Sequence, residues 1–251
     1  MVLLLLVDLD ADLAALRPLG GFFLLRTGAP PRSTLPSLAR TYADIKSDVY
    51  ENSLTFRVRK VAAALRTPET RTAASIAHQG LASRLWSAAL GCAVLYGRVP
   101  DLDARLLRWD ADGGAPDDLW LTEVRPLPGD AGTLARTVLD GHLEPLAEAL
   151  RTRYGPAAGL LRGNAASALA GAARQLELRT RAGGRPDLAA RTRDLTASLL
   201  GHPYLTGTGT LTGTAFRRRS CCLYYRVPGG GVCGDCCFTR PPRSSPHAAS
   251  G

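Results

Sequence analysis

Apolar residues recur at steps of three and four along much of the chain, the spacing that places side chains on one face of an α-helix. The clearest stripe leads up to Tyr96 and consists of Leu81, Leu85, Ala88, Cys92 and Leu95. Thr67-Pro68 precedes this stripe and predicts a helix start, because Thr can cap free backbone N–H groups and Pro needs none there. Further helices are expected over residues 36–65, 134–154, 156–178 and 186–200.

Residues 106–121 have a different pattern, with two short apolar runs on either side of an Asp-Gly-Gly turn. This pattern predicts two strands of a hairpin, in which Trp109 and Trp120 could pair. The fold class is therefore expected to be mainly α with a small β-hairpin, an α+β fold being the alternative.

A change in composition after residue 205 predicts the domain organisation. Residues 206–214 alternate Gly and Thr, which predicts a flexible polar connection. We expect a mainly helical body at 1–205, possibly a substrate-docking domain, and a C-terminal cysteine-rich module at 206–239. Residues 240–251 are rich in Pro, Ser and Ala and are expected to be a disordered tail.

Composition and charge narrow the choice of partners. The chain has 251 residues, 45% of them hydrophobic, and a formal net charge of +9. The basic residues are spread along the chain and form no face with interleaved aromatics, so nucleic-acid binding is not expected. The N-terminal apolar run is too short to span a bilayer and lacks a basic region before it. We therefore expect a cytoplasmic protein without integral membrane association.

Five of the six cysteines lie between Ser220 and Phe238 and form a C-C-x10-C-x2-C pattern with one further cysteine beside it. Cysteines crowded into one segment of a cysteine-poor chain usually hold a metal or are redox-active. The C-x2-C half lets two sulfurs converge across a tight turn, for which Gly234 is expected to supply conformational freedom. Cys92 belongs to the apolar stripe and is expected to be an ordinary buried thiol, whereas His78 is expected at the surface or as a cap.

Several chemistries remain open for this segment. A structural zinc site would use the same thiolates, although its usual signature is two separated knuckles. Adjacent side chains of an extended chain point to opposite faces, which suits a two-iron cluster better than one tetrahedral zinc. A disulfide framework is a third alternative, but cytosolic disulfides are rare. Redox-active thiols are the fourth.

The stretch Arg-Arg-Ser-Cys-Cys-Leu-Tyr-Tyr-Arg (218–226), followed by Gly-Gly-Gly-Val-Cys-Gly-Asp-Cys (229–236), resembles the C-terminal signature of the FhuF-like ferric-siderophore reductases. The resemblance implies a [2Fe–2S] cluster held by Cys221, Cys222, Cys233 and Cys236, with Cys237 outside the four-ligand pattern. Residues 160–169 also resemble that family's Trp-Gly-Asn helix, with Arg162 in place of Trp and with Gly163 and Asn164 matching.

The resemblance implies an oxidoreductase that passes one electron to the iron(III) of a ferric siderophore and releases iron(II). A separate electron donor is expected, because the sequence has no nicotinamide or flavin fingerprint. The alternative is a non-catalytic zinc- or iron–sulfur-binding module that acts as a sensor.

Residues near the cysteines are expected to adjust such a cluster. Arg217, Arg218, Arg219 and Arg226 would favour its reduced state by their charge or would dock a partner. Backbone N–H groups at 229–231 would donate to sulfur. Tyr224 and Tyr225 would shield the cluster.

Overall fold

The computed structural model describes residues 8–31, 34–43 and 52–242. Most of these residues are helical, and the strands are short. The α-helices are α1 (Leu38–Ala43), α2 (Ser53–Ala64), α3 (Thr70–Tyr96), α4 (Ala131–Leu134), α5 (Glu144–Tyr154), α6 (Ala158–Ala182) and α7 (Pro186–Leu200). The strands are β1 (Arg26–Thr27), β2 (Arg98–Pro100), β3 (Leu107–Trp109), β4 (Leu119–Leu121), β5 (Pro126–Pro128), β6 (Gly209–Thr212) and β7 (Ala215–Arg218). The predicted mainly helical fold is confirmed.

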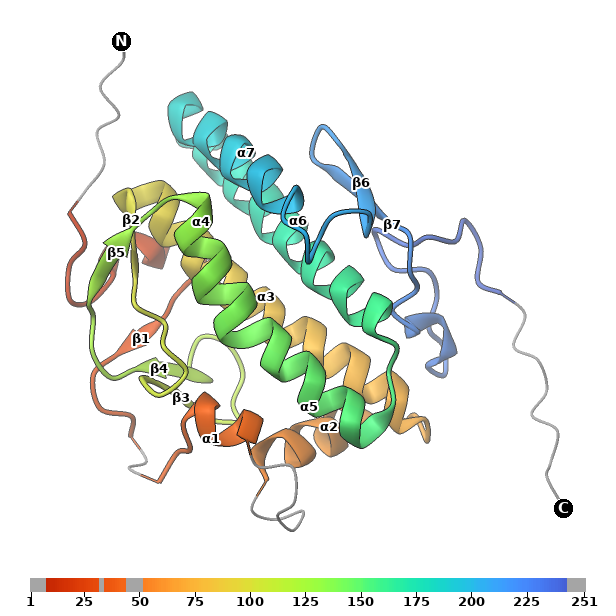
Figure 1. Ribbon diagram of the computed structural model, residues 1–251. Coiled ribbons are helices and arrows are strands. Elements are labelled where there is room, and N and C mark those ends of the chain that lie inside the picture. Colours follow the sequence, from red (N-terminus) through yellow and green to blue (C-terminus); the bar gives the residue numbers. More distant parts are fainter. Residues whose placement is uncertain (1–7, 32–33, 44–51, 243–251) are drawn as a thin grey trace, which may run out of the picture.

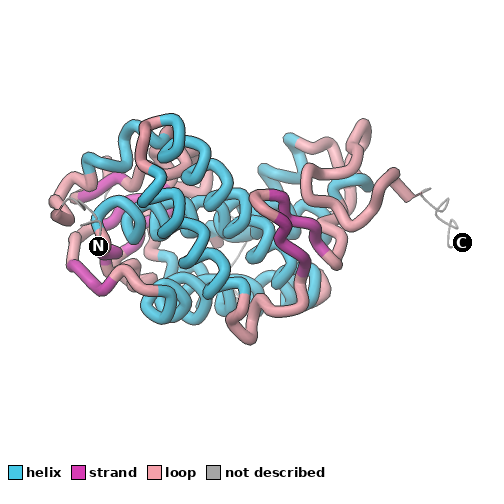
Figure 2. Tube along the Cα trace, turned by 90° about the horizontal axis from the view of Figure 1, so that it is seen from above, coloured by secondary structure: helices cyan, strands magenta, loops and turns pink. Residues whose placement is uncertain are grey.

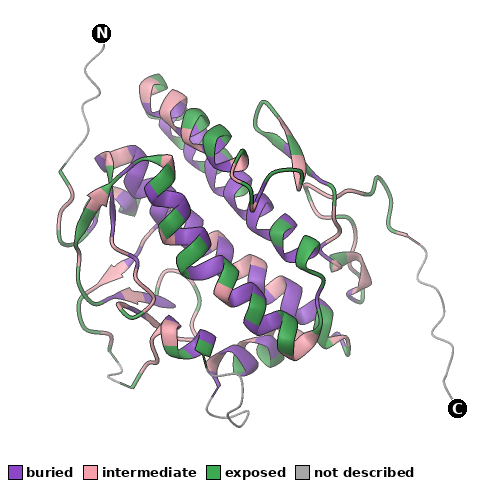
Figure 3. Ribbon diagram, viewed as in Figure 1, coloured by how far each residue is buried: buried purple, intermediate pink, exposed green. Residues whose placement is uncertain are grey.

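The helix α3 lies at the centre of the molecule, with α6 packed along it and α7 and α2 beside the pair (Figure 1). Its predicted stripe is buried except for the half-buried Leu95, but so is most of its remaining surface, as Figure 3 shows. Trp86, on a different face from the stripe, is completely buried. A helix with neighbours on every side is buried on all of its faces, so a single apolar stripe could not predict which residues of α3 are buried.

Small strands lie on one side of the helical layer and the β6–β7 hairpin lies on the other (Figure 2). The predicted hairpin at 106–121 is present, as β3 and β4 pair antiparallel with Trp109 opposite Leu119 and Arg108 opposite Trp120. The two tryptophans are therefore not a cross-strand pair. β1 joins β4 in parallel, and β2 pairs with β5.

Helix boundaries agree with the predictions in part. The helix at 186–200 is present as α7, and 156–178 corresponds to α6. The predicted helix at 134–154 is interrupted, because Ala135–Leu143 is a π-helical stretch between α4 and α5. The expected helix at 36–65 contains α1 and α2, and residues 44–51 lie outside the described part of the chain. So do residues 1–7 of the apolar run and 243–251 of the expected tail.

The stretch at 206–214 is more ordered than a flexible connection, because Gly209–Thr212 pairs antiparallel with Ala215–Arg218. Gly209 is required here, since a Cβ at this position would lie 2.3 Å from the ring of Phe216. Phe216 in turn belongs to the hydrophobic core of the helical body. The hairpin thus brings the cysteine-rich segment against α6. In the described residues no helix is long and apolar enough to cross a bilayer.

Candidate metal centre

The cysteines of the C-terminal segment gather in one place after β7. The sulfurs of Cys222 and Cys233 lie 3.5 Å apart. Burial, together with the neighbouring sulfurs of Cys222, Cys237 and Cys236, raises the pKa of Cys221 to about 11. The fold therefore brings the two halves of the C-C-x10-C-x2-C pattern together, and all of the cysteines are free thiols.

The sulfur spacing fits two ligands of one metal ion. A tetrahedral metal with bonds of about 2.3 Å to sulfur separates two of its sulfurs by about 3.8 Å. The Cys222–Cys233 distance is close to this value. Among the described residues, no three His, Cys, Asp or Glu side chains converge so that they could hold one metal ion. A two-iron cluster divides its ligands between two irons, so a single close pair such as Cys222 and Cys233 is compatible with it.

The hydrogen bond between Cys222 and Cys233 changes the pKa values of both thiols. The hydrogen bond between the Cys222 and Cys233 sulfurs lowers the pKa of Cys222 to about 6, and the backbone N–H of Tyr224 and the charge of Arg218 act in the same direction. The same hydrogen bond, together with burial, raises the pKa of Cys233. Thiolates are the form that binds metal, so Cys222 is suited to be a ligand at neutral pH.

The backbone of the segment is folded by a few tight turns. Leu223, directly after the vicinal pair, has φ 71°, and Gly229 has φ 72°. The Cys236 N–H donates to the Cys233 carbonyl at 3.1 Å, which closes the C-x2-C turn. Gly234 does not have a positive φ, so the freedom expected of it is not used. Gly230 is needed instead, because a Cβ there would lie 2.4 Å from the Tyr224 carbonyl oxygen.

Backbone donors to sulfur come from positions other than the expected glycines. The Leu223 N–H donates to Cys221 Sγ at 3.2 Å, and the Phe238 N–H donates to Cys236 Sγ at 3.4 Å. The Gly230 N–H donates to the Val227 carbonyl oxygen. Each half of the cysteine pattern thus has its own N–H···S bond, the kind of contact that stabilises thiolate ligands.

Asn164 of α6 anchors the vicinal cysteines to the helical body. Its side-chain amide donates to the carbonyl of Ser75 at 2.9 Å and to Ser75 Oγ at 3.0 Å. Ser75 Oγ in turn donates to the Cys222 carbonyl at 2.8 Å. Asn164 is completely buried, so these bonds hold the Cys222 backbone in one orientation. This gives the Gly-Asn of the family resemblance a role in positioning the cysteine segment.

Gly163 allows that segment to approach α6. A Cβ at this position would lie 2.2 Å from Ser220 Oγ and 3.2 Å from Arg218 Nη2. Ser220 Oγ also donates to the Gly159 carbonyl at 3.1 Å. The glycine therefore lets β7 and the start of the cysteine segment rest directly on the helix surface.

Arg218 is a buried cation beside the cysteines, and the acceptors of its side-chain hydrogen bonds are neutral groups. It is 2% exposed and donates to Asn164 Oδ1 at 2.5 Å, with longer contacts to Gln79 Oε1 and the Leu160 carbonyl. Its Nε has no hydrogen-bond partner among the described residues. A buried charge costs several kcal/mol unless an opposite charge lies near it, and the cysteine thiolates, or a cluster that they ligate, would supply that negative charge.

His78 lies next to this cation and is completely buried, contrary to the expected surface or capping position. Neither ring nitrogen has a hydrogen-bond partner in the described structure. Burial, together with the charge of Arg218, lowers the pKa of His78 to about 3. The ring is therefore neutral near pH 7. Cys92, as expected, is also completely buried, and burial raises its pKa.

The other arginines near the cysteines differ in their surroundings. Arg226 forms an ion pair with Glu69 at 2.7 Å, which attaches the Tyr224–Arg226 turn to the start of α3. Arg217 and Arg219 are exposed. The aromatic ring of Tyr225 contacts Phe238 edge to face, at 5.9 Å between centroids. Of the four arginines that were expected to adjust the cluster, only Arg218 is thus buried.

The geometry gathers free thiols of both halves of the cysteine pattern in one place. Residues 218–238 match the family model described as the FhuF 2Fe-2S C-terminal domain. The match contains all the clustered cysteines and begins at the buried Arg218. No curated protein matches the chain. A [2Fe–2S] site in this segment is thus supported both by its family match and by its clustered thiols.

Proposed function

We propose that the protein is a cytoplasmic ferric-siderophore reductase. The observation that carries the proposal is the thiol cluster inside the family match, where Cys222 and Cys233 lie 3.5 Å apart beside a buried cation. We assign Cys221, Cys222, Cys233 and Cys236 as the ligands. A [2Fe–2S] cluster bound there supplies one electron at a time, which converts chelated iron(III) to iron(II). Siderophore oxygen donors hold iron(II) far less tightly, so the metal is released.

The protein's own residues would orient and adjust this centre. Asn164 and Ser75 fix the Cys222 carbonyl, and the charge of Arg218 favours the more negative, reduced state. The electron would come from a separate donor, because the sequence has no nicotinamide or flavin fingerprint.

Two measurements on protein purified without oxygen test the proposal. Iron and acid-labile sulfide are expected in equal amounts, with visible absorption that bleaches on reduction. The reduced protein, mixed with a ferric siderophore and an iron(II) trap, should yield one iron(II) per cluster. Zinc without sulfide would contradict the cluster. A cluster that bleaches but gives no iron(II) would favour the non-catalytic sensor. Cys237→Ser should keep the cluster, since Cys237 lies outside the four-ligand pattern.

A further inference from the structure

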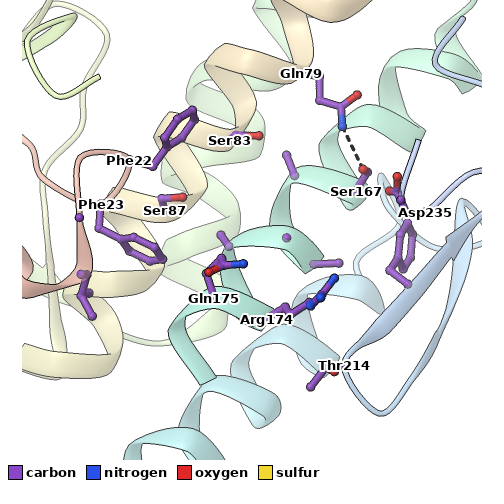
Figure 4. A pocket seen from close by; sticks show the side chains of 18 of the residues that line it. Phe22, Phe23, Gln79, Ser83, Ser87, Ser167, Arg174, Gln175, Thr214 and Asp235 are labelled. Atoms are coloured by element: carbon purple, nitrogen blue, oxygen red, sulfur yellow. Dashed lines mark hydrogen bonds between the residues drawn. The ribbon is translucent and has the colours of Figure 1, made fainter. Parts of the chain in front are cut away.

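A cavity of about 610 Å³ lies between α3, α6 and the C-terminal segment. Figure 4 shows Phe22, Ser83 and Ser87 on one side of it, and Thr214 and Asp235 on the other. Its size is within the range of small-molecule sites. Phe22 is 51% exposed, which leaves its ring available for contact.

The cavity reaches the metal centre. Gly234 and Asp235 belong to its wall, and these two residues are the x2 of the C-x2-C turn between Cys233 and Cys236. Consecutive Cα atoms are about 3.8 Å apart, so the wall is one residue away from two of the assigned ligands. A molecule bound here would lie within short electron-transfer range of a cluster on those sulfurs.

The charge in the cavity is positive overall. Arg174 and Arg179 of α6 line it, and Asp235 is the one acidic residue of the lining. Arg174 is exposed and, in the described part of the chain, forms no hydrogen bond or ion pair. Figure 4 shows its side chain extending into the space between α6 and the hairpin. Arg179 donates to the Pro18 carbonyl at 3.1 Å, which keeps its guanidinium at the cavity edge.

The walls are held in place by buried interactions. Arg84 and Asp118 form a buried ion pair at 2.9 Å, and Arg84 also donates to the carbonyls of Phe22 and Leu24. Across the cavity, Gln79 donates to Ser167 Oγ at 3.1 Å and accepts from Arg218. The site is therefore preformed, which lowers the entropic cost of binding a ligand.

We propose that this cavity is the docking site of the ferric chelate and that it selects chelates with net negative charge. The inference rests on the proposed reductase function and adds the location and charge class of its substrate. The chelate would contact Phe22 with its apolar part and Arg174 with its anionic oxygens, while its iron faces the Gly234–Asp235 wall.

The test uses gallium(III), which replaces iron(III) in oxygen-donor chelates but accepts no electron under these conditions. Two probes are titrated into the cluster-loaded protein by calorimetry: a hexadentate tris-catecholate complex of charge 3− and a neutral tris-hydroxamate complex. The anionic complex is expected to bind more tightly. Arg174→Gln should weaken its binding about fivefold or more and leave the neutral complex within about twofold. Arg40→Gln, the same charge change on α1 outside the cavity, is the control.

A second variant blocks the cavity without removing any contact. Gly171 lines it on α6, and a Cβ there would meet nothing within 4 Å. Gly171→Leu should therefore fold, which circular dichroism checks, and should abolish binding of both gallium complexes. Unchanged binding in Gly171→Leu would overturn the site. Equal loss of both complexes in Arg174→Gln would overturn the charge selection.

The docking site and the reductase function can be refuted independently of each other. If Gly171→Leu reduces ferric chelates at the wild-type rate, the docking site is wrong and the reductase function stands. If the wild-type protein binds the gallium complexes but releases no iron(II) from ferric ones, the cavity stands and the reductase function is wrong.

Discussion

Substitution of Gly163 by alanine tests whether the cysteine segment is seated on α6 as described. In an exposed helix interior, Gly→Ala is stabilising by about 1 kcal/mol, because alanine loses less backbone entropy. At Gly163 the new methyl group would lie 2.2 Å from Ser220 Oγ, so Ser220 must move and lose its bond to the Gly159 carbonyl. Overpacking costs about 1–3 kcal/mol and the lost hydrogen bond about 1 kcal/mol.

The net expectation for Gly163→Ala is a destabilisation of about 1–3 kcal/mol. For a chain of this size, that lowers Tm by roughly 2–12 °C. Thermal unfolding followed by circular dichroism gives the stability, and hydrogen exchange at the amides of residues 220–223 shows whether the loss is local. Faster loss of the cluster absorbance should accompany it, because the vicinal ligands follow Ser220 directly.

Two comparisons make this result specific. Gly171→Ala is the same substitution on the same helix, with nothing within 4 Å of the new Cβ, and should raise Tm by a few degrees. Gly163→Ala combined with Ser220→Ala removes the clashing oxygen and should recover most of the lost stability. If Gly163→Ala raises Tm as Gly171→Ala does, the cysteine segment does not pack directly against α6 at Gly163.

Three further outcomes are expected. Cys222→Ser should abolish cluster absorbance and iron retention, whereas Cys92→Ser should leave both intact; equal loss from the two would contradict the ligand assignment. Burial lowers the pKa of His142 from 6.5 to about 4, so its contribution to stability is present above pH 6.5 and is lost as the pH falls toward 4, by up to about 3 kcal/mol. Urea titrations between pH 7 and 4 should show a flatter slope in His142→Phe, and an unchanged slope would exclude this cause. Glu69→Gln breaks the partly exposed ion pair to Arg226, so hydrogen exchange at residues 224–227 should quicken with less than about 1 kcal/mol lost overall, and unaltered exchange there would show that the pair does not hold the turn.

The parts of the fold that depend on local signals could be predicted from the sequence. The last helix has Pro at its start and Gly after its end, and α7 spans the predicted residues. The hairpin at 106–121 was found from its turn residues. The cysteine pattern located the site because its spacing is a property of the chain itself. Each of these features could be predicted without knowing which distant parts of the chain are in contact.

Features set by distant contacts were missed. The Gly–Thr stretch before β7 suggested a linker, yet it is a strand because Gly209 makes room for the Phe216 ring on its partner. His78 was assigned to the surface because an isolated histidine has no partner in the local sequence. For Arg218 a signal did exist, since residues of a strand alternate between faces and Phe216 and Arg218 therefore share one. Because Arg217, Arg218 and Arg219 are consecutive, this signal was overlooked.

The polar face of the two central helices links the metal centre to the cavity. On α3, Ser75, Gln79 and Ser83 follow one another at steps of four, and on α6 Asn164 and Ser167 face them through hydrogen bonds. Ser75 holds the cysteine backbone at one end of this row, and Ser83 lines the cavity at the other. Because both sites are built on the same rigid pair of helices, their separation is fixed by helix geometry. A chelate in the cavity would therefore meet the C-x2-C turn at a constant distance, which is the condition a one-electron reductase needs.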